Sequence, residues 1–189
     1  MLTLFLFFFV IIAVFISVKK DIQLFENPVV TFIQEEINDI KTIDENKISE
    51  SSPHFDLEVI IYDFSDGRVT FEVNVFNPKV PMNQVFVSAF LGDNILRYLN
   101  TPHSLVSNII AVKKADKSLK KNYDLVPNGE IKEISVSSNM VYFENKNLND
   151  VLEEIPYILI KVSWFDDNNL PIVEYVKYTS NNYNIKTSK

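Results

Sequence analysis

Residues 66–81 read DGRVTFEVNVFNPKVP, and this stretch decides the fold. From Val69 to Phe76 every second side chain is apolar. The apolar set is Val69, Phe71, Val73 and Val75. A period of two is the mark of a half-buried strand, because successive side chains of a strand point to opposite faces. The apolar face needs a second layer to cover it, so the sequence from about Phe55 onward predicts a β-domain.

Further strands are expected on both sides of this stretch, each recognised by alternation and bounded by turn residues. They are His54–Phe64, Val85–Leu91, Ile95–Leu99, Ile131–Ser138, Tyr157–Phe165 and Pro171–Tyr178. Ser65-Asp66-Gly67 is expected to close one antiparallel hairpin and Gly92-Asp93-Asn94 a second one. Asn147–Ile155 predicts one short helix, with Asn147 or Asn149 as its N-cap. The prediction is an antiparallel β-sandwich with one short helix over residues 55–180.

The flanking segments are polar or mixed. Residues 19–54 are expected to form a linker, in which Asn27–Ile33 has the pattern of a first edge strand with proline near its start. Gln34–Glu50 is expected to be a helical turn or a continuation of that edge strand. Residues 181–189 are expected to be a polar tail.

Residues 1–18 contain no charged side chain. As a helix at ~1.5 Å per residue they would reach roughly 27 Å, close to the ~30 Å hydrocarbon core of a bilayer. We expect an uncleaved transmembrane anchor, which makes membrane lipid a partner. A cleaved signal peptide is opposed by the lack of a small-x-small pattern before Val18. A buried core helix is opposed by the apolar character all around the helix.

The side of the membrane follows from two opposing arguments. Lys19-Lys20 after the anchor would keep the domain in the cytoplasm by the positive-inside rule. A lone N-terminal anchor ahead of a β-domain more usually displays that domain outside. We therefore expect a single-pass protein with an extracytoplasmic domain.

Composition excludes several kinds of chemistry. The chain has 189 residues, no cysteine, two histidines, three glycines and a net charge of −7. Disulfides, thiolate sites, zinc sites and phosphate-cradling loops therefore lack their residues, and nucleic acid is a disfavoured partner. His54 and His103 are expected at the surface. No cofactor or catalytic residue is predicted, although the acidic residues leave a carboxylate pair in a cleft open.

Three charged clusters have both a functional and a plain interpretation. The lysines between residues 101 and 123 could contact anionic lipid headgroups, at ~1 kcal/mol each, or cover a solvated loop. They are Lys113, Lys114, Lys117, Lys120 and Lys121. The carboxylates of residues 35–50 could chelate a hard cation or form a solvated linker face, and Asp166–Asn169 could bind calcium or form a turn. The solvated face and the turn are favoured.

The order of four short pieces resembles the late embryogenesis abundant type 2 family, also called the water-stress and hypersensitive-response domain. The pieces are Val73–Pro78 (VNVFNP), Leu91–Leu96 (LGDNIL), Val126–Gly129 (VPNG) and Leu148–Leu152 (LNDVL), within about Asp56 to Tyr178. The resemblance implies a seven-stranded sandwich of immunoglobulin or fibronectin III type, often tethered by one N-terminal helix. It also implies stress-protective or membrane-associated roles without catalytic residues.

Three functions remain open at the level of sequence. The first is a non-enzymatic, membrane-anchored protein with a stress-protective or envelope-associated role. The second is a structural or adhesive surface subunit that binds other envelope proteins through strand edges. The third is lipid handling with an acyl chain between the sheets, suggested by Ile60 and Tyr62 and by Leu159 and Phe165 on the second faces of two strands.

Overall fold

The computed structural model describes residues 28–108 and 123–188. The chain divides into two compact units, Met1–Glu35 and Glu36–Lys189. The described part of the first unit is helical, because α2 (Pro28–Lys41) begins there. Proline suits the first position of a helix, where its missing N–H has no partner to lose.

The edge strand predicted at Asn27–Ile33 is therefore wrong, since residues 28–33 belong to α2. The β-branched residues Val29, Val30 and Thr31 suggested a strand, but strand propensity depends strongly on context. Farther along the same helix, Ile37 and Ile40 are both buried. Their spacing of three follows the helical period rather than the strand period.

The second unit contains two five-stranded sheets, which we call sheet A and sheet B. In spatial order, sheet A consists of β1 (Ile48–Ser49), β9 (Pro171–Thr179), β8 (Tyr157–Phe165), β4 (Asn83–Phe90) and β6 (Leu105–Ser107). Sheet B consists of β10 (Asn184–Ser188), β2 (Asp56–Phe64), β3 (Arg68–Phe76), β7 (Glu133–Tyr142) and β5 (Leu99–Asn100). Both sheets are mixed, because β1 pairs with β9 in parallel and β10 pairs with β2 in parallel.

The alternating stretch from Val69 to Phe76 lies in β3, the central strand of sheet B. β3 pairs with β2 on one side and β7 on the other, both antiparallel. Its four alternating apolar side chains are completely buried, which confirms the predicted inward face. The hairpin between β2 and β3 is also confirmed, and Gly67 turns it with a φ of 85°, a conformation that costs glycine little.

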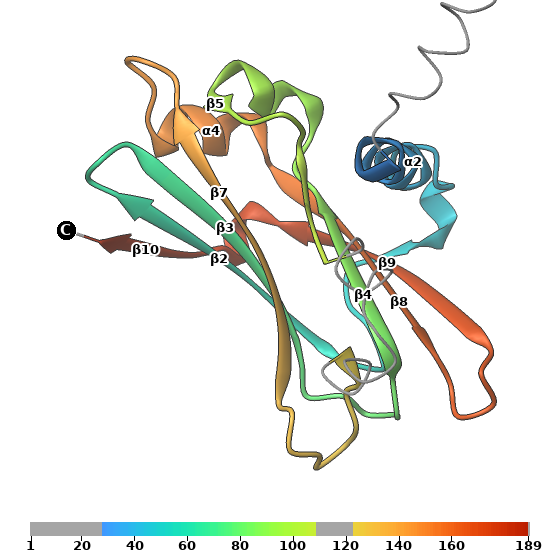
Figure 1. The fold of residues 1–189 in the computed structure, drawn as a ribbon. Coiled ribbons are helices and arrows are strands. Elements are labelled where there is room, and N and C mark those ends of the chain that lie inside the picture. Colours follow the sequence, from blue (N-terminus) through green and yellow to red (C-terminus); the bar gives the residue numbers. More distant parts are fainter. Residues whose placement is uncertain (1–27, 109–122, 189) are drawn as a thin grey trace, which may run out of the picture. The chain divides into compact units, whose positions relative to one another are not determined.

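One apolar core lies between the two sheets. Figure 1 shows β2, β3 and β7 in one layer and β4, β8 and β9 in the other. The core joins Phe71 and Val73 of sheet B to Val87, Ile160 and Trp164 of sheet A, all buried. The described chain is thus mostly β-structure in two facing sheets, as the alternating patterns predicted.

Short helices connect the strands. They are η1 (Glu45–Lys47), η2 (Asp93–Arg97), α4 (Leu148–Glu154) and η4 (Ser180–Asn182). The predicted helix at Asn147–Ile155 is confirmed as α4. Asn147 is its N-cap and forms a capping box with Asp150. In this box each side chain accepts a hydrogen bond from the backbone N–H of the other residue.

The structure differs from prediction at three further places. The expected hairpin of Val85–Leu91 with Ile95–Leu99 is wrong, because residues 93–97 form η2 and β5 joins the other sheet. Ile95 is buried as a helical residue, and a short apolar run does not tell helix from strand. Residues 184–188, expected in a polar tail, form β10. The pairing is mixed rather than purely antiparallel.

The anchor predicted at residues 1–18 lies outside the described residues. Within residues 28–108 and 123–188, no helix combines the length and the apolar character needed to cross a membrane.

Candidate functional site

The charged clusters singled out in the sequence have separate outcomes. The five lysines from Lys113 to Lys121 lie outside the described residues. Asp166–Asn169 forms the expected turn, in which the Asp166 carboxylate accepts hydrogen bonds from the backbone N–H groups of Asn168 and Leu170. These bonds hold the pKa of Asp166 below its usual value despite some burial. Among the described residues, no three acidic or histidine side chains are grouped for a metal ion.

The carboxylates of residues 35–50 do not form one solvated face. Glu36 is buried, and Lys161 of β8 places its Nζ 3.1 Å from Glu36 Oε2 and 2.6 Å from Asp39 Oδ2. The Tyr175 hydroxyl donates a hydrogen bond to the same oxygen of Asp39 at 3.0 Å. We call these four residues the Lys161 cluster. It ties residues 36–41 of α2 to the outer face of sheet A.

Opposing effects set the pKa values within the Lys161 cluster. Burial lowers the pKa of Lys161, but hydrogen bonds and charges from Asp39 and Glu36 outweigh burial and raise it overall. Burial raises the pKa of Asp39, but the hydrogen bond from Lys161 and the positive charge of Lys161 outweigh burial and lower the pKa of Asp39 below its usual value. Burial and the bond to Asp39 raise the pKa of Tyr175 to about 12. All three groups therefore keep their ordinary charge states at neutral pH.

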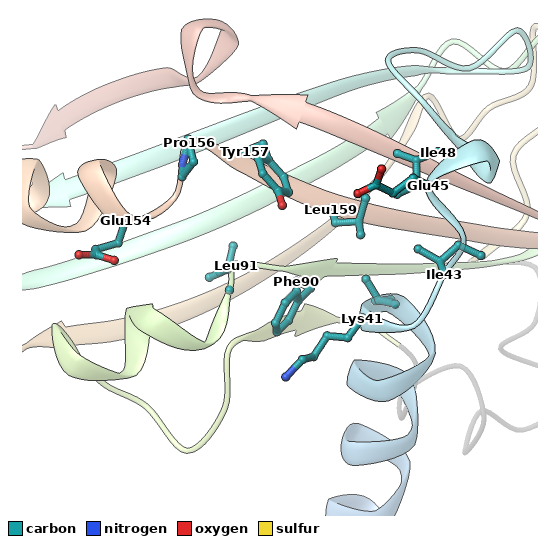
Figure 2. Close-up of a pocket in the computed structure, with 12 residues that line it drawn as sticks. Lys41, Ile43, Glu45, Ile48, Phe90, Leu91, Glu154, Pro156, Tyr157 and Leu159 are labelled. Atoms are coloured by element: carbon teal, nitrogen blue, oxygen red, sulfur yellow. The ribbon is translucent and has the colours of Figure 1, made fainter.

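A groove of about 400 Å³ opens beside the last turn of α2 (Figure 2). Its volume lies in the range of small-ligand pockets, about 300–1,000 Å³. Three parts of the second unit line it: the end of α2 with the segment after it, the end of β4, and the connection from α4 into β8. The apolar lining residues are Ile40, Ile43, Ile48, Phe90, Leu91 and Leu159. We call this site the α2 groove.

Local sequence places the walls of the α2 groove. Gly92 has a φ of 89°, and this turn takes the chain out of β4 and into η2. Asp93, the next residue, thereby lies 2.5 Å from Lys41 at the end of α2. On the opposite side Pro156 separates α4 from β8, so that Tyr157 and Leu159 face the groove.

The charged side chains of the α2 groove are mostly acidic. Lys41 is engaged, because it pairs with Asp93 and lies 5.7 Å from the centre of the Phe90 ring. Glu154 accepts a hydrogen bond from the Tyr98 hydroxyl at 2.9 Å, and this bond raises the pKa of Tyr98. No described cation lies within ion-pair distance of Glu45. Figure 2 shows Glu154 and Glu45 on opposite sides of Phe90, Leu91 and Leu159.

Within the part of the chain that the structure describes, His54 and Glu174 form a polar pair that resembles catalytic machinery. The Nδ1 of His54 lies 2.5 Å from Glu174 Oε1, and the His54 ring meets Trp164 edge-on at 5.7 Å between centroids. Such a histidine is oriented by a carboxylate, as a general base is. No described hydroxyl group hydrogen-bonds to its second ring nitrogen, as the nucleophile of a catalytic pair would. The predicted surface positions hold only in part, since His54 and His103 are both half-buried.

The sequence does not reveal the α2 groove, because its walls come from three segments that are far apart in the chain. They are residues 40–48, 90–92 and 154–159. One signal pointed to it. Leu159 is an apolar residue on the second face of its strand, and the structure places it in the groove lining. The spacing of Ile37 and Ile40 could likewise have identified the helix that borders the groove.

The fold and the groove define a class: a β-rich protein with two facing mixed sheets and an apolar, acid-rimmed groove on one outer face. No protein-family model and no curated protein sequence matches this chain. A similar solved structure is the GH20 exo-β-N-acetylglucosaminidase from Vibrio harveyi in complex with N-acetylglucosamine, at 8% identity and a TM-score of 0.37. The match covers 71% of this chain and 18% of that chain. At that TM-score the likeness defines neither a fold family nor an activity here.

Proposed function

We propose that this chain is a non-enzymatic, membrane-tethered binding protein whose α2 groove takes an apolar side chain of a partner polypeptide, flanked by basic residues. The observation that supports this most directly is the apolar lining between two separated carboxylates. The tether is the apolar segment 1–18, and the extracytoplasmic side is part of the proposal.

The apolar lining supplies the affinity in this proposal. Ile43, Ile48 and Phe90 are partly exposed in the groove. Apolar surface gains about 25 cal/mol for each Å² removed from water, so an inserted leucine or phenylalanine would be retained here. A solvated polar ligand would lose its hydration without replacing it.

The carboxylates supply the selectivity. Glu45 and Glu154 stand at the two sides of the groove, and Lys41 is already paired with Asp93. The whole chain carries a net charge of −7, which attracts basic partners from a distance as well. A partner with basic residues on both sides of its apolar anchor therefore fits the groove better than an acidic one.

The fold-level part of the proposal is an immunoglobulin-like sandwich of the late embryogenesis abundant type 2 kind. The ordered motifs of the sequence support it, together with the two facing sheets and the short capped helix α4 at the place of the LNDVL motif. The non-enzymatic character of the proposal is supported by the scarcity of histidine and the lack of cysteine. It is also supported by the His54–Glu174 pair, to which no hydroxyl group of residues 28–108 or 123–188 is hydrogen-bonded as a nucleophile.

Binding is tested with the full chain in lipid nanodiscs and two dye-labelled peptides that share a Leu-Phe anchor, one flanked by lysines and one by glutamates. Fluorescence anisotropy should show saturable binding of the lysine peptide that weakens with added salt. Glu45→Lys should weaken it about fivefold, the equivalent of ~1 kcal/mol. Glu133→Lys, the same change on sheet B, is the control. Equal binding of both peptides would contradict the proposal.

The apolar contribution needs its own pair of variants. Ile43→Ser removes an apolar side chain from the groove, and Val173→Ser removes an exposed apolar side chain from β9, outside the groove lining. We expect weaker peptide binding only for Ile43→Ser. The same loss for both variants would mean that the peptide adsorbs without using the groove.

The tether is tested by protease protection on spheroplasts with a tag after Lys189. Removal of the tag without lysis supports the extracytoplasmic side. Protection until lysis would place the domain in the cytoplasm and change the set of available partners, while leaving the peptide measurement unaffected.

A further inference from the structure

Two polar side-chain atoms near the far end of β8 are shielded from water and have no hydrogen-bond partner among the described residues. They are Trp164 Nε1 and Glu174 Oε2. Trp164 is 1% exposed. Buried polar groups almost always have a partner, and an exception points to a water molecule or ligand that satisfies it. Together these two atoms make a candidate binding site.

Both atoms belong to the same side of sheet A. Trp164 pairs across the strands with Ile172, and Val162 pairs with Glu174, so Trp164 and Glu174 are diagonal neighbours on one face. Diagonal neighbours in a sheet are about 7–8 Å apart at the backbone, and long side chains can share a ligand across that distance. His54 contacts both residues, through its bond to Glu174 and its ring contact with Trp164.

The two atoms require complementary chemistry from one ligand. The indole N–H only donates and needs an acceptor, while an ionised carboxylate only accepts and needs a donor. A cation would be repelled by the indole N–H, and an anion would be repelled by the carboxylate. A neutral hydroxyl group satisfies both, because it accepts one hydrogen bond and donates another.

We propose that a single hydroxyl group binds between Trp164 Nε1 and Glu174 Oε2, accepting from the indole and donating to the carboxylate. In water alone this hydroxyl belongs to a bound water molecule, as in other buried polar sites. The side chain of His54 is 37% exposed and borders the site, which gives a polyol hydroxyl a route to the same place. The site is separate from the α2 groove, which uses the opposite end of β8.

The chain offers an unusually clean test, because Trp164 is its only tryptophan. Full-length protein labelled with ¹⁵N-tryptophan therefore gives one indole N–H resonance. We expect a nuclear Overhauser effect from that proton to a long-lived water. The measurement uses the unsubstituted protein, so its outcome does not depend on whether any variant folds.

Titration with two polyols identifies the source of the hydroxyl. Titration with glycerol and then sorbitol should leave the indole resonance unchanged if water is the occupant. A saturable shift with contacts to polyol protons would assign the hydroxyl to a solute, and either result supports the site. Glu174→Met should abolish the contact, whereas Glu133→Met should not. An indole proton with no contact to water or polyol in the unsubstituted protein would overturn the proposal.

Discussion

Lys161 lies on the outer face of a strand, and its charge is satisfied by an element far away in the sequence. Its side chain is 14% exposed, and both of its carboxylate partners belong to α2. Removing one member of a buried ion pair is costly because the other charges stay buried without compensation. Lys161 therefore selects the position of residues 36–41, and with them one wall of the α2 groove.

The first prediction concerns this lysine. Lys161→Met should lower the free energy of unfolding by about 2 kcal/mol, less than for a fully buried pair because Asp39 is half exposed. Urea unfolding at constant m-value measures the change. Lys177→Met, an exposed lysine on the neighbouring strand β9, is the control and should change little. Equal effects of the two variants would show that the Lys161 cluster does not stabilise the fold.

The second prediction is a dependence on pH through Asp39. The pKa of Asp39 is lower in the folded state than the ordinary value of 3.8. Its contribution is therefore fully present above the unfolded-state pKa and is lost as pH falls through the lower folded-state value. The stability difference between the unsubstituted protein and Asp39→Asn should be largest above about pH 4 and shrink below it. A difference that grows on acidification would contradict this.

At the scale of elements, local signals were decisive where capping or turn chemistry fixed an end. Asn147 and Pro156 bracketed α4, and Asp66-Gly67 fixed the first hairpin. The same reasoning failed for α2, because its β-branched first turn resembles a strand. It failed for η2 as well, because five residues are too few for any period to show. Tertiary packing of Ile40 and Ile95 decides both cases, and packing is not local information.

The third prediction concerns the cap of α4. Asn147→Ala removes a side chain that accepts from the backbone N–H groups of Asn149 and Asp150, and should cost about 1 kcal/mol. Hydrogen exchange of residues 148–154 should quicken in parallel with the loss measured by urea unfolding. Asn149→Ala leaves the cap intact and should be nearly neutral. A neutral Asn147→Ala would mean that packing alone holds this helix.

At the scale of the whole molecule, alternation predicted two facing sheets, because each long strand has one face on which apolar side chains predominate. The short strands β1, β5 and β6 and the polar strand β10 carry no such signal, so the sequence did not predict the parallel pairings of β1 and β10. The α2 groove was also not predicted, because its walls come from segments that are far apart in the sequence and meet only in the folded chain. Leu159 shows what the sequence could indicate. An apolar residue on the outer face of a sheet predicts that another element packs over that face, but it does not identify the element.

The fourth prediction is a ranking of local stability. β3 is paired on both sides and its inward residues are completely buried, whereas β10 is an edge strand with exposed residues. Hydrogen–deuterium exchange followed by mass spectrometry should therefore show residues 69–76 as the slowest peptide and residues 184–188 among the fastest. Equal protection of the two peptides would mean that β10 opens only with global unfolding.

The parallel pairing of β10 with β2 orders events during synthesis. A ribosome makes β2 early and β10 far later, so the growing chain can close the β2–β3 hairpin long before the neighbour on the other side of β2 exists. Until then, one row of β2 backbone groups is open to any extended peptide. Truncated translation products of this chain would keep that row exposed, and chaperones and proteases that recognise open strands would find it there.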